Sequence, residues 1–550
     1  EVLYKVKLPG NPIIGEGKPE NQNHAVIFTR GEHLQTLDMN QDNYLGEAYK
    51  LRNLLSCFKE NVRIVGCREH IFSEAGGAVA AFAASDEFAF GTTLQRFMAY
   101  PLCARFHYGH PDLWDKVWTC TNGGVSKASR TLHLSEDIFG GFNVISRGGD
   151  IVYQEFIHVG KGRDVTFVAT NSFAQKISGG NAFQCVSRDV ARLSHSFDIG
   201  RLLSLYCSGP GFFVSSTLVV WSAYFLAVTL LILSMLRMET FFPTLGLMQD
   251  LQFTGYEIPN QGTKGDEQTL GAEFLLQIGF LMVLPIFAEE VLEFGLRHAL
   301  GTQLRQQLSL RLLYTFFQER TKACYFDRAM QLGEAKYIAT GRSFEGMTSS
   351  FKGLFKAFAR THFIFGTELA AILVLYGMHT HIYNGYPATG LGVYAVNTIP
   401  LWIFVAALWL APWVFNPSTL SSLSLWQNFH SFLLWVDGPI AGPDSWQAWN
   451  DASMAKARSK SVRTRLGLYL TRTCPQRLVL LFISLGAFEV DELPPSMSTS
   501  YARETISLWI GGFALVASFL FFFVSDSGSS RKLCGVFYGG DDDDAVRVVF

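Results

Sequence analysis

Residues 201–236, RLLSLYCSGPGFFVSSTLVVWSAYFLAVTLLILSML, decide the architecture of this chain, because a polar half changes into an apolar one within them. The sequence up to Cys207 is rich in glycine and charged residues, and apolar segments follow from Gly209 with almost no linker. A run of about 20 apolar residues is long enough to cross a bilayer core of about 30 Å. The sequence therefore predicts a catalytic or binding domain joined directly to a membrane bundle, acting on material made at the bilayer or passed through it.

The composition of the 550 residues narrows the classes of protein that fit. Their net charge of −2 shows no basic excess, so we expect no nucleic-acid partner. The nine cysteines show neither a C-x-x-C pair nor a zinc-like spacing, so we expect no disulfide framework and no metal bound by them. The chain begins at Glu1 without the pattern of a signal peptide, and we expect it to be the C-terminal piece of a longer protein.

Six apolar segments are candidates for membrane-spanning helices, and loop charge gives them an orientation. Lys and Arg are concentrated at 294–362 and 451–477, whereas the other loops carry few of them. Because cytoplasmic loops collect Lys and Arg, this alternation places the polar domain, both basic loops and the C-terminus in the cytosol. The six segments are 211–236, 271–293, 363–382, 392–414, 477–490 and 505–524.

Two of these segments are weaker than the others. The second contains Pro285 and ends in three glutamates, and the fifth is short. The resulting division of the chain is a cytosolic domain, two spans, a basic cytosolic loop, a spanning hairpin, a second cytosolic loop, two further spans and an acidic cytosolic tail. Their boundaries are 1–207, 208–293, 294–362, 363–414, 415–476, 477–525 and 526–550.

Residues 351–360 have the pattern of an amphipathic helix, with apolar residues at helical spacing and basic residues beside them. Such a helix can lie in the lipid interface, or it can pack as a cytosolic helix on the polar domain, and the sequence favours neither. Residues 424–435, rich in Leu, Phe and Trp, are a second candidate for an interfacial helix.

Short apolar runs alternate with a helical pattern in the first 207 residues. Residues 25–28 (AVIF) and 63–66 (RIVG) have the pattern of buried strands, and Tyr44–Phe58 has the apolar stripe of a helix. Alternating strands and helices predict an α/β domain built on a mostly parallel sheet. Such sheets bind ligands beyond the carboxyl ends of their strands, so polar loops are the place for a site.

Two polar clusters near the start of the domain carry candidate residues. Lys18, in GKPENQ, can hold a phosphate as a point charge, unless this stretch is only a solvated turn. Asp38, Asn40 and Asp42 resemble the start of a calcium-binding EF-hand loop, but Asn43 replaces the required glycine. They predict either a helix cap or a carboxylate pair near a nucleotide diphosphate, with or without a divalent metal ion.

Two further clusters lie in the middle of the domain. His107 and His110 are three residues apart, but a glycine and a proline keep them off a regular helix, so we expect a rigid loop wall in place of zinc. Lys127, in GGVSKAS, is followed by Glu136 and Asp137. Two adjacent carboxylates suit general-base chemistry at a strand end, with one accepting a proton and the other orienting it. Alone, such a pair is more often a helix cap.

The remaining candidates are basic or amide residues. Lys161 and Arg163 lie in VGKGRD, which does not match a Walker A loop, and Arg68 lies in REHIF. Gln184 and Arg188 closely precede the first apolar segment. An arginine and an amide there can contact a diphosphate leaving group or the growing product, or they can anchor the domain at the interface.

Nine strings from these clusters resemble, in the same order, the signatures of one family: the 1,3-β-glucan synthases, which comprise fungal glucan synthases and plant callose synthases. The resemblance covers most of 4–418 and is dense through Asp164, and SWQAW at 445–449 is a thinner match. The nine strings are GKPENQNHA, IFTRGE, LDMNQDNY, REHIF, FHYGHPD, GGVSKAS, LSEDIFGGFN, VGKGRD and KYIATGRSF.

The resemblance implies an inverting glycosyltransferase with a partial GT-A-like fold and an α-helical membrane bundle. Such an enzyme moves glucose from UDP-glucose to the 3-hydroxyl of a growing chain and passes the polymer through its own membrane helices. Lys18 and Asp38 match positions regarded as active-site residues in the family. Ser135-Glu136-Asp137 is similar to the Thr-Glu-Asp motif of cellulose synthases, which implies Asp137 as general base with Glu136 as the alternative.

Gln184 and Arg188 take the place of the cellulose synthase Gln-x-x-Arg-Trp motif, with one extra residue between them and no Trp after them. The catalytic residues expected overall are Asp137, Glu136 and Asp38. The substrate-binding residues expected are Lys18, Asn40, Asp42, Arg68, His107, His110, Lys127, Lys161, Arg163, Gln184 and Arg188.

The expected partners are UDP-glucose, a β-1,3-glucan chain and membrane lipid, in a multi-pass protein of the plasma membrane. A divalent cation (Mg²⁺ or Mn²⁺) and a regulatory small GTPase are left open. Family members are far longer, so part of the UDP pocket is expected before Glu1, and this segment alone is expected to be inactive. The rival hypotheses are a transporter with a regulatory cytosolic domain, a degenerate non-catalytic scaffold, and a synthase with a different product such as a mixed-linkage glucan.

Overall fold

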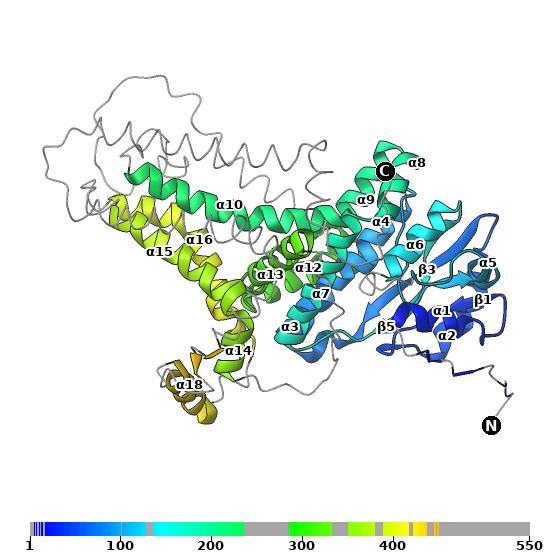
Figure 1. Ribbon diagram of the computed structural model, residues 1–550, viewed down its shortest axis with the longest axis horizontal. Helices are drawn as coiled ribbons and strands as arrows, with labels where there is room; N and C mark the ends of the chain where they lie inside the picture. Colours follow the sequence, from blue (N-terminus) through cyan, green and yellow to red (C-terminus); the bar gives the residue numbers. More distant parts are fainter. Residues whose placement is uncertain are drawn as a thin grey trace, which may run out of the picture. The chain divides into compact units, whose positions relative to one another are not determined.

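The computed structural model describes residues 17–100, 102–127, 136–235, 287–332, 350–379, 389–416 and 422–436, with a few single positions outside these ranges (Figure 1). The chain divides into two compact units. Unit 1 comprises Glu1–Ala227, Thr244–Ala370 and Asn397–Phe432, and it holds every candidate site residue. Unit 2 comprises Val228–Pro243, Ala371–Val396 and Leu433–Phe550.

The polar half of unit 1 is a mixed α/β structure. The expected strand at 63–66 lies within β3, and the helix expected at 44–58 corresponds to α2, so both predictions are confirmed. The elements in chain order are α1 (Lys18–Val26), β1 (His33–Gln35), β2 (Gln41–Asp42), α2 (Leu45–Leu55), β3 (Val62–Ile71), η1 (Phe72–Gly76), α3 (Ala78–Phe88), the π-helical turn η2 (Ala89–Leu94), α4 (Gln95–Ala99), β4 (Leu113–Asp115), α5 (Lys116–Thr121), α6 (Glu136–Ser146), β5 (Asp150–Lys161), α7 (Phe167–Cys185), α8 (Arg188–Ser196) and α9 (Ile199–Ser208).

The described strands form one sheet in the order β1-β4-β3-β5-β2. Strands β3 and β5 run parallel, with Ile71 paired with Lys161 at their carboxyl ends, and the other three pairs are antiparallel. The expectation of a mostly parallel sheet was therefore wrong, because the sheet is mixed. The connection from β3 to β5 is long enough for a parallel crossover. Strand β4, three residues long, follows the loop 102–112 and runs antiparallel to β3.

Residues 25–28, expected as a buried strand, are the end of helix α1 and the turn behind it. Pro19 lies at the start of this helix, where its fixed φ suits a helix and its missing N–H has no intrahelical partner to lose. Val26 is buried, but Ile27 is 58% exposed. The strand prediction was therefore wrong, and Lys18 lies on a helix instead of in a solvated turn.

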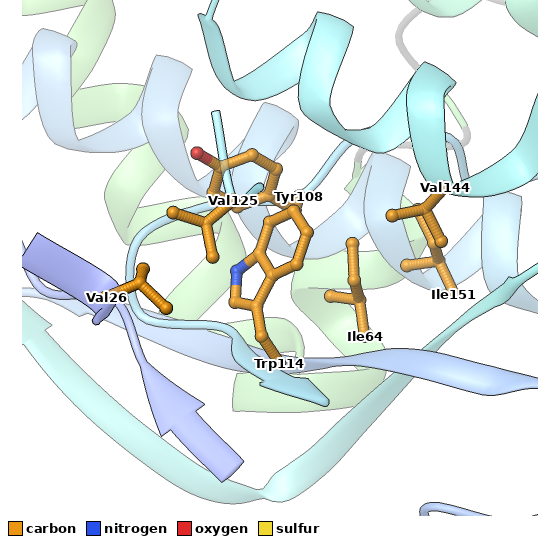
Figure 2. Packing of buried hydrophobic residues seen from close by; sticks show 7 residues of the cluster. All are labelled: Val26, Ile64, Tyr108, Trp114, Val125, Val144 and Ile151. Atoms are coloured by element: carbon orange, nitrogen blue, oxygen red, sulfur yellow. The ribbon is translucent and has the colours of Figure 1, made fainter. Parts of the chain in front are cut away.

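A hydrophobic core joins the sheet to α1 and α6 (Figure 2). The rings of Trp114 and Tyr108 meet edge to face with their centroids 4.5 Å apart, and both are fully buried. Since Tyr108 lies between His107 and His110 in the chain, its burial fixes the histidine loop beside α6. The seven residues drawn in Figure 2 are Val26, Ile64, Tyr108, Trp114, Val125, Val144 and Ile151.

Apolar helices follow the polar half. Among the described residues, two helices are long and apolar enough to cross a membrane: Pro210–Ile232, within α10 (Pro210–Met235), and Phe351–Met378. The second consists of α14 (Phe351–Phe358), the π-helical turn η5 (Ala359–Phe363) and α15 (Ile364–Met378). A shorter apolar helix, Thr398–Val414, lies within α16 (Thr389–Val414), and the other helices are α12 (Leu296–Leu308), α13 (Arg311–Leu332) and α18 (Ser422–Val436).

The expected spans at 477–490 and 505–524 lie outside the described residues, as does most of the one at 271–293. A bundle of six spans therefore stays a prediction.

Helix α14 packs on protein along its buried face. The ring of Phe358 contacts Phe317 of α13 and Phe167 of α7, with centroids 5.1 and 6.2 Å apart. Because Phe167 belongs to the polar half, this face of the helix packs on the polar domain, and the cytosolic placement of the helix stays a prediction. Contact of its other face with lipid stays a prediction.

Candidate active site

Three carboxylates from two parts of the polar half lie near one lysine, which contacts two of them. The Nζ atom of Lys18, in the first turn of α1, lies 2.8 Å from Oε1 of Glu136 and 3.5 Å from Oδ1 of Asp38. Asp38 lies in the turn between β1 and β2, and Glu136 and Asp137 form the first turn of α6. We call Lys18, Asp38, Glu136, Asp137 and His107 the carboxylate cluster.

Asp137 is paired with His107 in this cluster. Nε2 of His107 lies 3.4 Å from Oδ2 of Asp137, and Oδ1 of Asp137 accepts a hydrogen bond from the backbone N–H of Ile138 at 2.9 Å. Burial acts to raise the pKa of the Asp137 carboxyl, but the hydrogen bond and charge of His107, with smaller contributions from His110 and Lys18, outweigh it and hold that pKa well below its usual range. Asp137 is therefore an ionised proton acceptor.

Glu136 differs from its neighbour in electrostatic environment. Burial raises the pKa of the Glu136 carboxyl, the negative charge of Asp137 raises it further, and Lys18 opposes both. Burial also acts to lower the pKa of Lys18, but Glu136 and Asp38 outweigh it and raise that pKa. Adjacent carboxylates whose environments move their pKa values apart are typical of acid–base sites.

Helix α1 is anchored to the histidine loop and to the segment before α6 by two amide side chains. Nε2 of Gln22 lies 3.0 Å from Nε2 of His110, and Oε1 of Gln22 accepts a hydrogen bond from Ser126. Asn23 exchanges two hydrogen bonds with the backbone of Ser126, at 2.7 and 3.0 Å. Gln22 is four residues after Lys18, so a helical reading of this stretch would have placed both on one face.

His110 is held in this anchor. Its side chain is buried, and burial followed by the charge of Lys18 lowers its pKa to about 4, so the ring is neutral near pH 7. Its contact with Gln22 fixes the loop against α1.

Lys161 and Arg163 lie in a second group of charges, the buried ion cluster, which they form with Glu69 and Glu87. Nζ of Lys161 lies 2.6 Å from Oε1 of Glu69 and 3.4 Å from Oε1 of Glu87, and Arg163 pairs with Glu87. Burial acts to raise the pKa of Glu87, but Arg163 and Lys161 lower it to about 2. The positive charges expected to face substrate are thus already neutralised by two glutamates that the sequence did not single out.

Gln41 connects the two clusters. Its Oε1 accepts a hydrogen bond from the backbone N–H of Asp38 at 2.8 Å, and its Nε2 donates to Oε1 of Glu69 at 2.9 Å. The side chain of Asn40 donates to the carbonyl of Gly162 at 2.5 Å, which ties the same turn to the end of β5. Asp42, also in the predicted set, is exposed in β2 and accepts a hydrogen bond from the N–H of Asn43 at 2.7 Å.

Arg68 lies in a different network from the carboxylate cluster. It pairs with Glu155 at 3.7 Å and with Glu293, while Arg96 holds both carboxylate oxygens of Glu155 at 2.6 Å and Oε2 of Glu289 at 2.7 Å. The charge of Arg68 thus binds carboxylates of this chain. Glu289 and Glu293, two of the three glutamates that end the segment expected to span at 271–293, therefore contact the polar domain.

The last three predicted residues, Lys127, Arg188 and Gln184, differ in their contacts and exposure. The backbone N–H of Lys127 donates to the carbonyl of Glu136 at 3.3 Å, and its Nζ lies 3.2 Å from Oδ2 of Asp189. Arg188, beside Asp189, is exposed at the start of α8. Gln184 is buried near the end of α7, and its Nε2 has no hydrogen-bond partner among the described residues.

The residues around the carboxylate cluster do not fit a divalent cation as they stand. The ammonium group of Lys18 already lies between Asp38 and Glu136, where a cation would be repelled. No group of three or more His, Cys, Asp or Glu within the described ranges is arranged to hold a metal ion.

Comparison with known proteins identifies the family of this chain. The profile of the family described as "1,3-beta-glucan synthase component" matches residues 1–469. Similar curated proteins of Arabidopsis thaliana are putative callose synthase 6 (42% identity over 477 residues, 85% of this chain and 24% of that protein), callose synthase 7 (40%, 85% and 24%) and callose synthase 3 (41% over 465 residues, 82% and 23%). This chain spans about a quarter of the length of these relatives. With a family match over most of its length, the chain belongs to the 1,3-β-glucan synthase component family.

Proposed function

We propose that this chain belongs to a synthase that transfers glucose from UDP-glucose to the 3-hydroxyl of a growing β-1,3-glucan, with inversion at the anomeric carbon. The observation that carries the proposal is the pair Glu136–Asp137, whose carboxyl pKa values lie on opposite sides of their usual range, with Lys18 and His107 as the charged and hydrogen-bonding partners. The names of the callose synthase relatives support the same product class.

Asp137 acts as the general base in this proposal. A sugar hydroxyl is a weak nucleophile, so a carboxylate that accepts its proton lowers the barrier. The O3–C1 bond forms as the bond between C1 and the diphosphate oxygen breaks, the proton passes to Asp137, and UDP leaves with the bonding electrons. A single displacement of this kind inverts C1. Glu136 is the alternative base, since its raised pKa is closer to neutrality.

Lys18 and the neighbouring basic groups are proposed to stabilise the charge that develops on UDP. Lys18 is the best placed of them, because its Nζ is within 3.5 Å of two of the three carboxylates of the cluster. Lys127 is the next best placed of these basic groups, since its backbone N–H donates to the carbonyl of Glu136. No step is assigned to a divalent cation, because the ammonium group of Lys18 lies between Asp38 and Glu136.

Export of the polymer through the membrane is the second part of the proposal. Helix α10, an apolar helix of 26 residues, begins two residues after α9 ends, so the catalytic domain and the first candidate span are almost continuous. A processive enzyme at the bilayer needs such proximity for its product to leave directly. A multi-pass protein of the plasma membrane, with the polar half in the cytosol and lipid around its spans, is consistent with this arrangement. A regulatory small GTPase remains part of the hypothesis.

The test is glucan synthesis by the full-length protein in membranes supplied with radiolabelled UDP-glucose. For Asp137→Asn we expect label in a product digestible by 1,3-β-glucanase to fall about 10²- to 10⁴-fold, the usual contribution of general acid–base catalysis. Asp150→Asn, which changes an exposed carboxylate at the start of β5, serves as the matched control. Synthesis that persists in Asp137→Asn but is lost in Glu136→Gln would move the base to Glu136. Properly inserted wild-type protein that makes no glucan, beside an active control, would contradict the proposal.

A further inference from the structure

An exposed aromatic ring lies next to the histidine that holds the proposed base. Phe90, in the π-helical turn η2, is 38% exposed, and its ring centroid is 5.4 Å from that of His107 at an interplanar angle of 68°. Nε2 of His107 lies 3.4 Å from Oδ2 of Asp137. One imidazole ring therefore separates Phe90 from the carboxylate that would receive the proton of the attacking hydroxyl.

The Phe90 residue is partly accessible to a ligand. In an edge-type contact, His107 can cover at most one face of the phenyl ring, and 38% of the residue is exposed. A pyranose presents C–H bonds on its faces and hydroxyls around its rim. An aromatic face carries partial negative charge and apolar area, so it complements those C–H bonds.

Phe90 and His107 are fixed by one buried anchor. The side chain of Gln95 donates to the backbone carbonyl of Phe90 at 3.4 Å and accepts a hydrogen bond from Nε of Arg105 at 2.8 Å. Arg105 in turn pairs with Asp112 at 2.9 Å, and both of these side chains are almost wholly buried. The anchor therefore positions η2 and the histidine loop relative to each other without using either Phe90 or His107, as a preorganised binding surface requires.

From this placement we infer that Phe90 is the platform on which the terminal glucose of the acceptor chain stacks, so that its 3-hydroxyl reaches Asp137. The inference rests on the proposed function and assigns a residue to its acceptor side. The donor side, by contrast, is assigned to Lys18, which contacts Glu136 and Asp38, whereas His107 contacts Asp137. Loss of the Phe90 ring should therefore weaken acceptor binding and leave UDP-glucose binding largely unchanged.

The experiment measures synthesis by the full-length protein in membranes with β-1,3-linked glucose oligosaccharides as added acceptors, together with the length of the product. For Phe90→Leu, which keeps apolar volume but removes the ring, we expect the half-saturating acceptor concentration to rise about tenfold or the product chains to shorten, with the KM for UDP-glucose within twofold. One stacking contact is typically worth a change of this size. Phe90→Tyr should retain wild-type behaviour.

Phe97→Leu is the matched control, because Phe97 is 43% exposed on the adjoining helix α4. An unchanged acceptor dependence and product length in Phe90→Leu, or a change equal to that of Phe97→Leu, would overturn the platform. So would a rise confined to the KM for UDP-glucose. Wild-type membranes that make no 1,3-β-glucan would contradict the proposed function itself, which is a different result from glucan synthesis that does not depend on Phe90.

Discussion

The Nζ atom of Lys18 lies 2.8 Å from Oε1 of Glu136, so the first turns of α1 and α6 meet at a single ion pair. The pair brings Asp38 and Asp137 with it, because Asp38 shares the lysine and Asp137 follows Glu136 on the same helix. This convergence turns a basic residue and a carboxylate pair, separated by more than a hundred positions, into one site.

The pH dependence of activity should report the pairing of His107 with Asp137. Burial opposes ionisation of Asp137, but His107 more than compensates, so the carboxylate persists to lower pH than usual. Replacement of His107 by Leu removes this effect, raises the pKa of Asp137, and should move the acidic limb of the kcat/KM profile to higher pH. His107→Asn, which keeps a hydrogen-bond donor, should restore part of the shift. An acidic limb that does not move in His107→Leu would show that His107 does not set the pKa of the catalytic base.

The close approach of α6 to the histidine loop depends on Gly141. A Cβ atom at this position would collide with the backbone carbonyl oxygen of Phe106, and backbone cannot move aside as a flexible side chain does. We expect Gly141→Ala to lower stability by about 1–3 kcal/mol, as overpacking typically does, and to reduce synthesis by displacing Asp137 from His107. The readouts are thermal unfolding of the detergent-purified protein and glucan synthesis.

Gly109→Ala is the control for Gly141→Ala. A Cβ at Gly109 meets no atom within 4 Å, although Gly109 lies in the histidine loop that Gly141 of α6 approaches. Equal losses in the two variants would contradict the explanation that a collision between Gly141 and the histidine loop causes the loss.

The buried ion cluster should contribute to stability in a pH-dependent way. Glu87→Gln leaves Lys161 and Arg163 with Glu69 as their remaining partner in the cluster, and breaking a buried pair typically costs about 3–5 kcal/mol. Because the pKa of Glu87 is lowered to about 2, its contribution is present above the ordinary glutamate pKa and is lost as the pH falls toward 2. The difference in unfolding temperature between wild type and Glu87→Gln should therefore be largest near neutrality and shrink in acid. The exposed Glu74→Gln should show no such difference at any pH.

Chelation of divalent cations tests whether Lys18 or a divalent metal ion supplies the positive charge in the site. In the carboxylate cluster, Lys18 already supplies a positive charge between Asp38 and Glu136. We therefore expect wild-type membranes to retain most of their glucan synthesis in EDTA, and Lys18→Met to lose it with or without added Mg²⁺ or Mn²⁺. Rescue of EDTA-treated wild type by either metal would contradict this expectation.

The sequence by itself determined the features that depend on neighbouring residues. The apolar stripe of 44–58 and the short run at 63–66 predicted α2 and part of β3, because periodicity reflects local geometry. The length and apolar character of 211–236 likewise predicted a helix that can span a bilayer. The run at 25–28 misled, because four apolar residues fit the end of a helix as well as a strand, and Pro19 started the helix.

Only the tertiary structure decided which charges meet. Lys161 and Arg163 were predicted to bind substrate, yet the parallel pairing of β3 with β5 brings Glu69 to Lys161, and α3 adds Glu87. Lys18, expected to hold a phosphate, lies beside Asp38 and Glu136, because α1 and α6 contribute Val26 and Val144 to one shared core (Figure 2). Local sequence sets the type of each side chain and of many elements. The partner of a charge depends on the burial of distant residues, which no short window of sequence contains.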